Sequence, residues 1–380
     1  MAIGLVLALV AVTAASSLLI ARAISNGFPN RVIVNVPSTF PEPSLPGQPS
    51  TPAVSSLAAL LTVLTAAPDT PGVTVDQALA ARIVDNLWPV REQALDSYDL
   101  STLADFETGS ALQGDTAVLA ARACGCPDPL PRPVSSRNLF VPRESAYPAW
   151  FISELTTSPV NGSSPDVSLM VFTRASAATH WMVRLETGYS FASGDAWIYA
   201  TPEAIPGGFD LPTPIRNELP GDLAAYYQHW ASDGTAPTSP FAPGVFTSAQ
   251  GQTQAALDQS FTAAGQVHRV VYTIDLAGDG VWSVAANNVR ERPVYGWGLT
   301  CGTVRYEAVT SLAKGAAPMI QPADLSTWGS SVPAGQYTRI TQWGLHESCV
   351  LDDAAGIPFI VLGHNGGVIR STGVLAGGSI

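Results

Sequence analysis

The sequence predicts an α+β fold: an N-terminal transmembrane helix followed by two tandem domains, each built of helices and an antiparallel sheet. Three observations support this. Residues 3–20 form an uncharged apolar run, and residues 37–52 form a Pro-rich stretch. After them, helical periodicity gives way twice to short runs of β-branched and aromatic residues separated by Pro, Gly, Asn and Ser. Helices followed by several strands is the order typical of α+β folds.

The apolar run is the strongest single signal. It is rich in Leu, Val, Ala and Ile, and about 18 such residues suffice to cross a hydrocarbon core as a helix. Residues 1–23 are therefore expected to be a signal anchor. The alternative is a signal peptide cleaved after Ala23, because Ala21-Arg22-Ala23 has the small-x-small form of a cleavage site. An Arg inside that triplet is unusual, which favours the anchor.

The sequence gives conflicting signals about the side of the membrane on which the body lies. Arg22 and Arg31 follow the run and no basic side chain precedes it, a pattern that would keep the body in the cytoplasm. The four cysteines and the Pro-rich tether favour the opposite side. We expect a single-pass cell-membrane protein of the envelope, with residues 24–72 as a tether carrying a short apolar helix and the body extracytoplasmic.

The composition argues against a disordered protein and against a nucleic-acid-binding protein. With 46% hydrophobic and 13% charged residues, the body is expected to fold. A formal net charge of -12 argues against nucleic acid, whose binding needs Lys and Arg to neutralise phosphates. Lys314 is the only lysine, a bias towards Arg that, in an Ala-rich and Pro-rich chain, is typical of a high-GC genome such as that of an actinobacterium.

The cysteines form an even set, Cys124, Cys126, Cys301 and Cys349, which allows three pairings. Cys301 and Cys349 both lie in strand-like segments and are expected to pair. Cys124 and Cys126 either close a tight local disulfide or remain two thiols. Zinc sites of the knuckle type need a two-residue spacer and a second Cys or His pair, so no metal and no cofactor is expected.

The first domain is predicted over residues 73–201. Thr74 and Gln77 have the spacing of a capping box at the start of a helix that contains Pro89. A short helix at 54–67 precedes it, a second helical stretch at 99–123 is broken near Gly109 and Gly114, and strands are expected at 139–141, 149–152, 168–172 and 181–185.

Residues 202–222 are predicted to be a linker and residues 223–380 the second domain. The expected helices cover 223–231 and 253–263, and the expected strands cover 267–275, 281–285, 304–309, 337–342 and 359–362.

Four short stretches of the predicted first domain resemble stretches of a known protein family. They are residues 86–96 (Asn-Leu-Trp-Pro-Val-Arg-Glu-Gln-Ala-Leu-Asp), 106–112 (Phe-Glu-Thr-Gly-Ser-Ala-Leu), 141–143 (Val-Pro-Arg) and 147–151 (Tyr-Pro-Ala-Trp-Phe). The region from Val73 to Thr187 resembles an actinobacterial family of envelope proteins whose shared domain has no assigned function. Such domains resemble the nuclear transport factor 2-like, or cystatin-like, fold, in which a long helix lies inside a bent antiparallel sheet and forms an open cone. The resemblance implies a pocket and no particular chemistry.

Aromatic residues are the candidates for that pocket. Most are expected to pack in the core and the remainder to line an apolar cavity. The candidates are Trp88, Phe106, Tyr147, Trp150, Trp181 and Tyr189, with Phe151 beside them.

Catalytic patterns are weak. His346, Glu347 and Ser348 are consecutive and, on one strand, cannot converge as a triad because neighbours face opposite sides. The segments 275–280 and 363–367 suggest hairpin turns more than calcium or phosphate loops. We therefore expect a non-enzymatic envelope protein, tethered to the membrane, that binds a protein partner or an apolar ligand. The alternative is a hydrolase-like enzyme that uses a cone-shaped pocket.

Overall fold

The computed structural model describes residues 56–122, 133–142, 145–157, 166–190, 202–204, 213–238, 240–275, 278–288, 297–321, 332, 335–353 and 359–376. The expected anchor, most of the tether, Cys124 and Cys126 lie outside these residues. Within them, no helix has both the length and the apolar character needed to cross a bilayer. The chain from Pro46 onward forms one compact unit.

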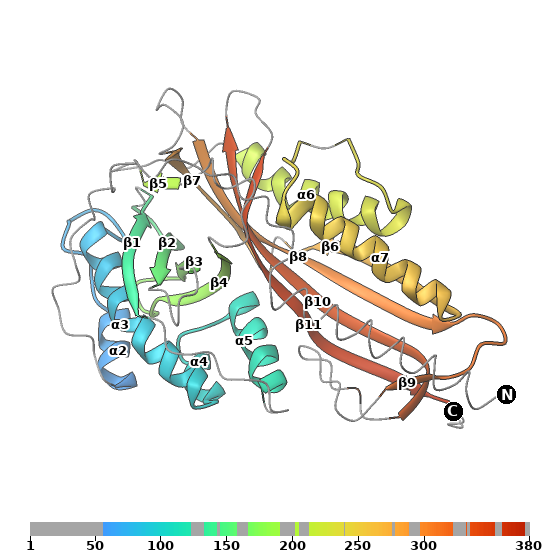
Figure 1. The fold of residues 1–380 in the computed structure, drawn as a ribbon. Helices are drawn as coiled ribbons and strands as arrows, with labels where there is room; N and C mark the ends of the chain where they lie inside the picture. The colour runs from blue at the N-terminus through green and yellow to red at the C-terminus, as the bar shows by residue number, and fades with distance from the viewer. Residues whose placement is uncertain are drawn as a thin grey trace. The chain divides into compact units, whose positions relative to one another are not determined.

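The first half of this unit is helical and then β, as predicted (Figure 1). Its helices are α2 (Leu57–Leu64), α3 (Gln77–Asp96), α4 (Leu100–Ala104) and α5 (Gly109–Arg122). Its strands are β1 (Val134–Phe140), β2 (Ala149–Thr157), β3 (Asp166–Arg174) and β4 (Met182–Ser190). These strands form the first sheet, antiparallel throughout, in the order β1-β2-β3-β4.

Helix boundaries follow local chemistry. The Asp76 side chain, rather than Thr74, caps α3 by accepting a hydrogen bond from the Leu79 N–H at 2.8 Å, so the expected capping box does not form. Pro89 lies inside α3, which runs on to Asp96. Gly109 separates α4 from α5 and has φ 63°, a conformation that favours glycine, whereas Gly114 lies within α5 and breaks nothing.

The second half adds helices α6 (Thr213–Asp233) and α7 (Gln250–Ala263), preceded by a short π-helix, η3 (Val245–Ala249). Its strands are β5 (Pro202–Ala204), β6 (Gln266–Ile274), β7 (Val281–Asn288), β8 (Trp297–Leu312), β9 (Met319–Gln321), β10 (Gly335–Asp353) and β11 (Ile360–Leu375). They form the second sheet, with the central order β11-β10-β8 and with β6 and β7 both paired to β8.

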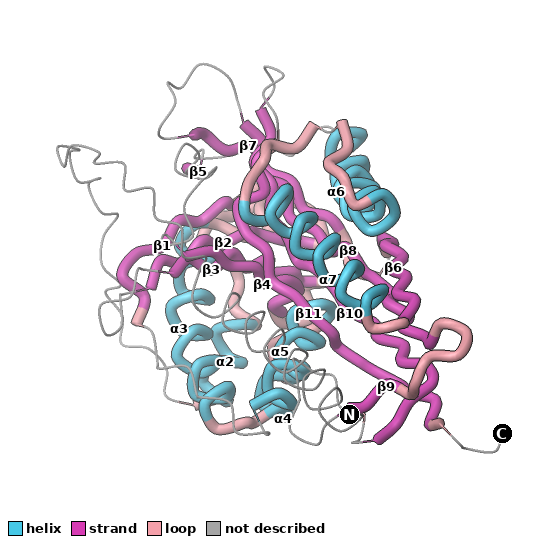
Figure 2. The backbone as a smooth tube through the Cα atoms, turned by 45° about the vertical axis from the view of Figure 1, so that its right-hand side comes forward, coloured by secondary structure: helices cyan, strands magenta, loops and turns pink. Residues whose placement is uncertain are grey.

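Four layers result. Helices α2 to α5 cover one face of the first sheet through a core that includes Phe106, Phe151 and Trp181. The other face of the first sheet packs on the second sheet, where Trp150 and Leu185 meet residues such as Leu299. Helices α6 and α7 lie along the far face of the second sheet (Figure 2). The two predicted domains therefore share a core.

The two predicted hairpin turns do not form. The Asp279 N–H donates to the Asp275 carbonyl at 2.8 Å, so the chain turns there, but β6 and β7 do not pair with each other. Both strands pair with the same edge of β8, with Ile274 opposite Val304 and Val281 opposite Gly302. Residues 363–367 lie inside β11, where Asn365 pairs with Glu347. Asn-Gly sequences mark turns only where the chain must reverse, and here β10 supplies a continuous partner strand.

The disulfide Cys301–Cys349 forms as expected. The two residues are directly opposite each other in β8 and β10, with Cα atoms 4.1 Å apart, and both are fully buried between the sheets. The bridge therefore fixes the register of β8 and β10 where the first sheet packs against them.

This bridge gives the first prediction. It joins residues 48 apart in the sequence, so reduction is expected to lower the free energy of unfolding by about 2–4 kcal/mol through the added freedom of the unfolded chain. Thermal unfolding with and without dithiothreitol measures the effect. The Cys301→Ala/Cys349→Ala variant serves as the control and is expected to unfold at the same temperature in both conditions; equal sensitivity to reductant would contradict the prediction.

Candidate functional site

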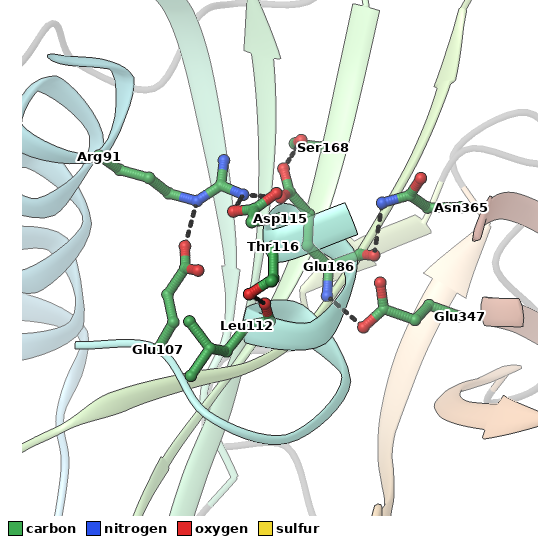
Figure 3. A network of polar contacts seen from close by, with 9 residues as sticks. All are labelled: Arg91, Glu107, Leu112, Asp115, Thr116, Ser168, Glu186, Glu347 and Asn365. Atoms are coloured by element: carbon green, nitrogen blue, oxygen red, sulfur yellow. Dashed lines mark hydrogen bonds and ion pairs between the residues drawn. The ribbon is translucent and has the colours of Figure 1, made fainter. Parts of the chain in front are cut away.

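A buried arginine organises the most polar part of the interior. Arg91 on α3 has a side chain that is 3% exposed, and it contacts three carboxylates. Its Nε donates to Glu107 Oε1 at 2.6 Å, and its Nη2 donates to Asp115 Oδ2 at 2.5 Å and to Glu186 Oε2. Figure 3 shows the guanidinium pointing into this group of oxygens.

Each carboxylate comes from a different element. Glu107 follows α4 and is held against β4, where the Thr108 N–H donates to the Val183 carbonyl at 2.9 Å. Asp115 lies one turn into α5, and Glu186 lies on β4. The Ser168 hydroxyl on β3 donates to Glu186 Oε1 at 2.7 Å, which fixes that side chain from the opposite side.

A fourth acid joins this network across the two sheets. Glu347 on β10 is 1% exposed, and its Oε1 accepts the Glu186 N–H at 3.2 Å (Figure 3). The Asn365 side chain on β11 donates to the Glu186 carbonyl at 3.4 Å. Glu347 Oε2 and Glu107 Oε2 are buried and have no hydrogen-bond partner in the described part of the chain.

Three carboxyl groups thus contact one guanidinium and a fourth, that of Glu347, lies next to them, which changes the pKa values of the three glutamates. Burial raises the pKa of Glu347 well above 4.5, and the nearby Glu186 and Asp115 add to the effect. Burial also raises the pKa values of Glu107 and Glu186, more than Arg91 lowers them. The carboxyls of Glu347, Glu107 and Glu186 therefore retain protons to higher pH than an exposed Glu does.

A cavity of about 240 Å³ lies beside this network. Polar side chains of Arg91, Asp115, Ser168, Glu186 and Asn365 line it. Its carboxyls are suited to proton exchange or to holding a positively charged group. Within the described residues, no three His, Cys, Asp or Glu side chains gather in a way that would hold a metal ion.

The His346-Glu347-Ser348 segment lies on β10, and the alternation expected of a strand separates its members. Glu347 reaches Glu186, whereas His346 packs with Tyr306 and His364 under α6, at ring distances of 4.9 and 4.4 Å. Burial lowers the pKa values of both histidines, that of His364 to about 4, so they are neutral near pH 7. His346 and Glu347 therefore do not form a catalytic pair.

A second hollow lies on the second sheet, on the face opposite α6 and α7. We call this surface the open face; it is formed by alternate residues of β6, β8 and β10, among them Val267, Arg269, Val271, Val309, Arg339 and Trp343. The hollow has a volume of about 690 Å³. Val267 and Val271 are 53% and 38% exposed, so apolar surface meets solvent here.

The strand register maps this face. Val267 is opposite Ser311, which is opposite Arg339, and the next row contains Arg269 and Val309. Val271, Glu307, Trp343 and Arg370 form the row after that. An apolar diagonal therefore runs from Val267 through Val309 to Trp343, with arginines on both sides.

The sequence-predicted aromatic residues pack mainly in the interior. Trp88, Phe106, Phe151 and Trp181 belong to the core between the helices and the first sheet, and Tyr147 packs against it half-buried. Trp150 packs between the two sheets. Tyr189 lies on β4, and its side chain is outside the described set. None of the described members lines either hollow.

Sequence reasoning missed the Arg91 network. One signal was present: Arg91 is four residues from both Leu87 and Leu95, so a charged residue stands within the apolar stripe of α3. The identity of its partners had no local signal, because Glu107, Asp115 and Glu186 come together only after the chain folds.

Comparisons with known proteins add little. Residues 70–196 match a protein family described as a domain of unknown function (DUF8094). No curated protein matches the chain. A solved structure from work titled "Structural insights into dehydratase substrate selection for the borrelidin and fluvirucin polyketide synthases" is 13% identical, covers 75% of this chain and 87% of that chain, and has a TM-score of 0.11. A likeness of that size carries no argument about fold or activity.

The Arg91 network predicts that substitutions of Arg91 and of Arg82, both on α3, lower the free energy of unfolding by very different amounts. Arg91→Met leaves buried carboxylates without their counter-charge and is expected to lower the free energy of unfolding by about 3–5 kcal/mol. Arg82→Met removes an exposed pair with Asp69 and is expected to cost no more than about 1 kcal/mol. Urea denaturation of both variants measures the difference, and equal losses would contradict a structural role for the Arg91 network.

The raised pKa of Glu347 predicts a pH dependence. The folded chain keeps this proton to higher pH than the unfolded chain does, so the contribution of Glu347 to stability falls as pH rises from 4.5 towards its raised pKa. Glu347→Gln cannot ionise and keeps an oxygen for the Glu186 N–H.

The free energy of unfolding of the Glu347→Gln variant, relative to the wild type, is therefore expected to increase between about pH 5 and about pH 8. Urea denaturation at both pH values measures this. Glu307→Gln, which changes an exposed side chain on β8, is the matched control. A difference between variant and wild type that does not change with pH would show that Glu347 is ionised throughout.

Proposed function

We propose that this protein is a membrane-tethered protein of the cell envelope that acts by binding, not by catalysis, and that its binding surface is the open face of the second sheet. One observation carries the proposal. The same strands, β6, β8 and β10, are covered on one face by α6 and α7, while on the other face Val267 and Val271 remain exposed beside a hollow of about 690 Å³.

The geometry suits a binding surface. β8 and β10 are long and are each paired on both sides, and β6 is paired with β8 along its length, so side chains on this face keep a fixed spacing. Trp343 supplies a large apolar ring, held by a hydrogen bond from its Nε1 to Glu307 at 3.2 Å. Apolar centres with polar rims are the usual form of protein interaction sites.

The membrane tether and the extracytoplasmic location belong to the proposal as well. They rest on the apolar run at residues 3–20 and the Pro-rich stretch that follows. The nuclear transport factor 2-like cone remains a prediction; a long helix, α3, packed on one face of a four-stranded antiparallel sheet is in keeping with it.

The alternative is a hydrolase-like enzyme, and one observation favours it. Glu186 lines a cavity and has a pKa raised by burial, which is a property of general acids. We prefer the binding function because the Glu186 oxygens are already engaged by Arg91 and Ser168. A general acid must be able to give its proton to a substrate, and these bonds hold the carboxyl in a structural role.

Photo-crosslinking in the membrane tests the proposed surface with the full chain. A benzoylphenylalanine at Val271, on the open face, is expected to form an adduct whose mass identifies the bound molecule. The control is the same residue at Gln259, which is exposed on α7 over the opposite face. Adducts at Gln259 alone, or none at Val271, would contradict the proposal.

A further inference from the structure

The open face carries more positive charge than the rest of the molecule would suggest. The chain has a formal net charge of -12, yet Arg269 and Arg339 line the hollow and Arg370 lies beside it, its guanidinium 4.0 Å above the Trp343 ring. Within the described residues, none of these three arginines forms a salt bridge. Arginine remains charged at any physiological pH, so this charge is available to a ligand.

The other charged side chains at the hollow are Arg305 and Glu307. Arg305 is paired with Asp279 through contacts of 2.7 and 2.5 Å, and its Nη1 donates to Gln113 Oε1 at 3.0 Å. Glu307 accepts the neutral Trp343 Nε1–H. Against this one carboxylate stand Arg269 on β6 and Arg339 on β10, which lie on the two sides of the apolar diagonal, and Arg370 beside Trp343.

We propose that the open face binds an anionic lipid, whose acyl chain lies along the diagonal from Val267 through Val309 to Trp343 and whose carboxylate or phosphate headgroup is held by Arg269 or Arg339. This inference rests on the proposed function and names the ligand class of the same surface. Arginine recognises carboxylate and phosphate oxygens with two parallel hydrogen bonds, and the valines and Trp343 suit a hydrocarbon chain.

A lipid fits this surface better than a peptide. Extended peptides commonly bind by adding a strand to a sheet edge, where they find free backbone donors and acceptors. Here β8 is paired with β6 and β10, and β10 is paired with β8 and β11. On the outer edge of β6, the Gln228 side chain of α6 accepts the Tyr272 N–H at 2.9 Å and donates to the Val270 carbonyl at 3.1 Å, so these backbone groups are used as well. An acyl chain needs none. The hollow of about 690 Å³ also lies within the usual size of small-molecule sites, roughly 300–1,000 Å³.

Quenching of Trp343 fluorescence by a brominated lipid tests this. Full-length protein in dodecyl maltoside is titrated with dibrominated stearate and, separately, with its neutral methyl ester, which has the same chain. The anion is expected to quench saturably and to bind about tenfold more tightly than the ester, because only the anion pairs with arginine. Trp343→Phe should remove the saturable part of the quenching, which places the ligand on the open face.

Two further variants test whether Arg269 and Arg339 hold the anionic headgroup. Arg269→Gln/Arg339→Gln is expected to weaken stearate binding about tenfold while leaving the ester unchanged. Arg82→Gln, far from this face on α3, is the matched control and should change neither. Equal binding of anion and ester would overturn the lipid proposal and leave the binding function standing.

Two other outcomes also count against it. Quenching that persists in Trp343→Phe would place the lipid elsewhere and overturn the proposal. Absence of quenching by either probe, together with a protein-sized adduct at Val271, would overturn the lipid in favour of a protein partner. Absence of both signals would remove the proposed function itself.

Discussion

Arg91 is the group on which the arrangement of the layers depends. Its side chain contacts carboxylates from the segment between α4 and α5, from α5 and from β4, so one guanidinium joins the helices to the edge of the first sheet. The Glu186 backbone N–H in turn donates a hydrogen bond to Glu347 on the second sheet. Removing a buried charge from such a group leaves its partners desolvated and unpaired, which is why buried networks of this kind tolerate few substitutions.

The same network explains how the two sheets meet. β4 is an edge strand of the first sheet, and its Glu186 contacts Glu347 on β10. Thr187 on β4 lies close to Gly363 on β11: a Cβ atom at residue 363 would be 3.0 Å from the Thr187 hydroxyl. Around this contact the sheets bury a shared apolar core containing the Cys301–Cys349 bridge. Polar contacts at the edge thus set the position, and apolar burial beside them supplies most of the stabilisation.

Much of the fold could be predicted from the sequence, and the reasons are local. Helical periodicity placed most of the helices, and runs of β-branched and aromatic residues separated by turn residues placed nearly every strand, because both signals reflect which side chains a local element buries. Strand length was underestimated: β8 extends from Trp297 to Leu312, beyond the predicted 304–309. A strand flanked on both sides can include glycine and polar residues that would end an isolated one. Residues 363–367 stay within β11 because each of them has a partner on β10, from Cys349 opposite Gly363 to Leu345 opposite Gly367. The site was harder, since Arg91 signals an internal partner but not which acids supply it.

The long strands of the second sheet have two different surroundings along one side. On β8, Leu299 and Cys301 face the first sheet and are fully buried, whereas Arg305, Glu307 and Val309 continue the same alternation beyond its edge. On β10, Cys349 likewise faces the first sheet, whereas Trp343 lies on the open face. On this side of each strand, the inner half packs against the first sheet and the outer half carries arginine, valine and tryptophan side chains. One regular alternation of side chains therefore supplies both the buried contact between the sheets and the open face, and the edge of the first sheet separates the two.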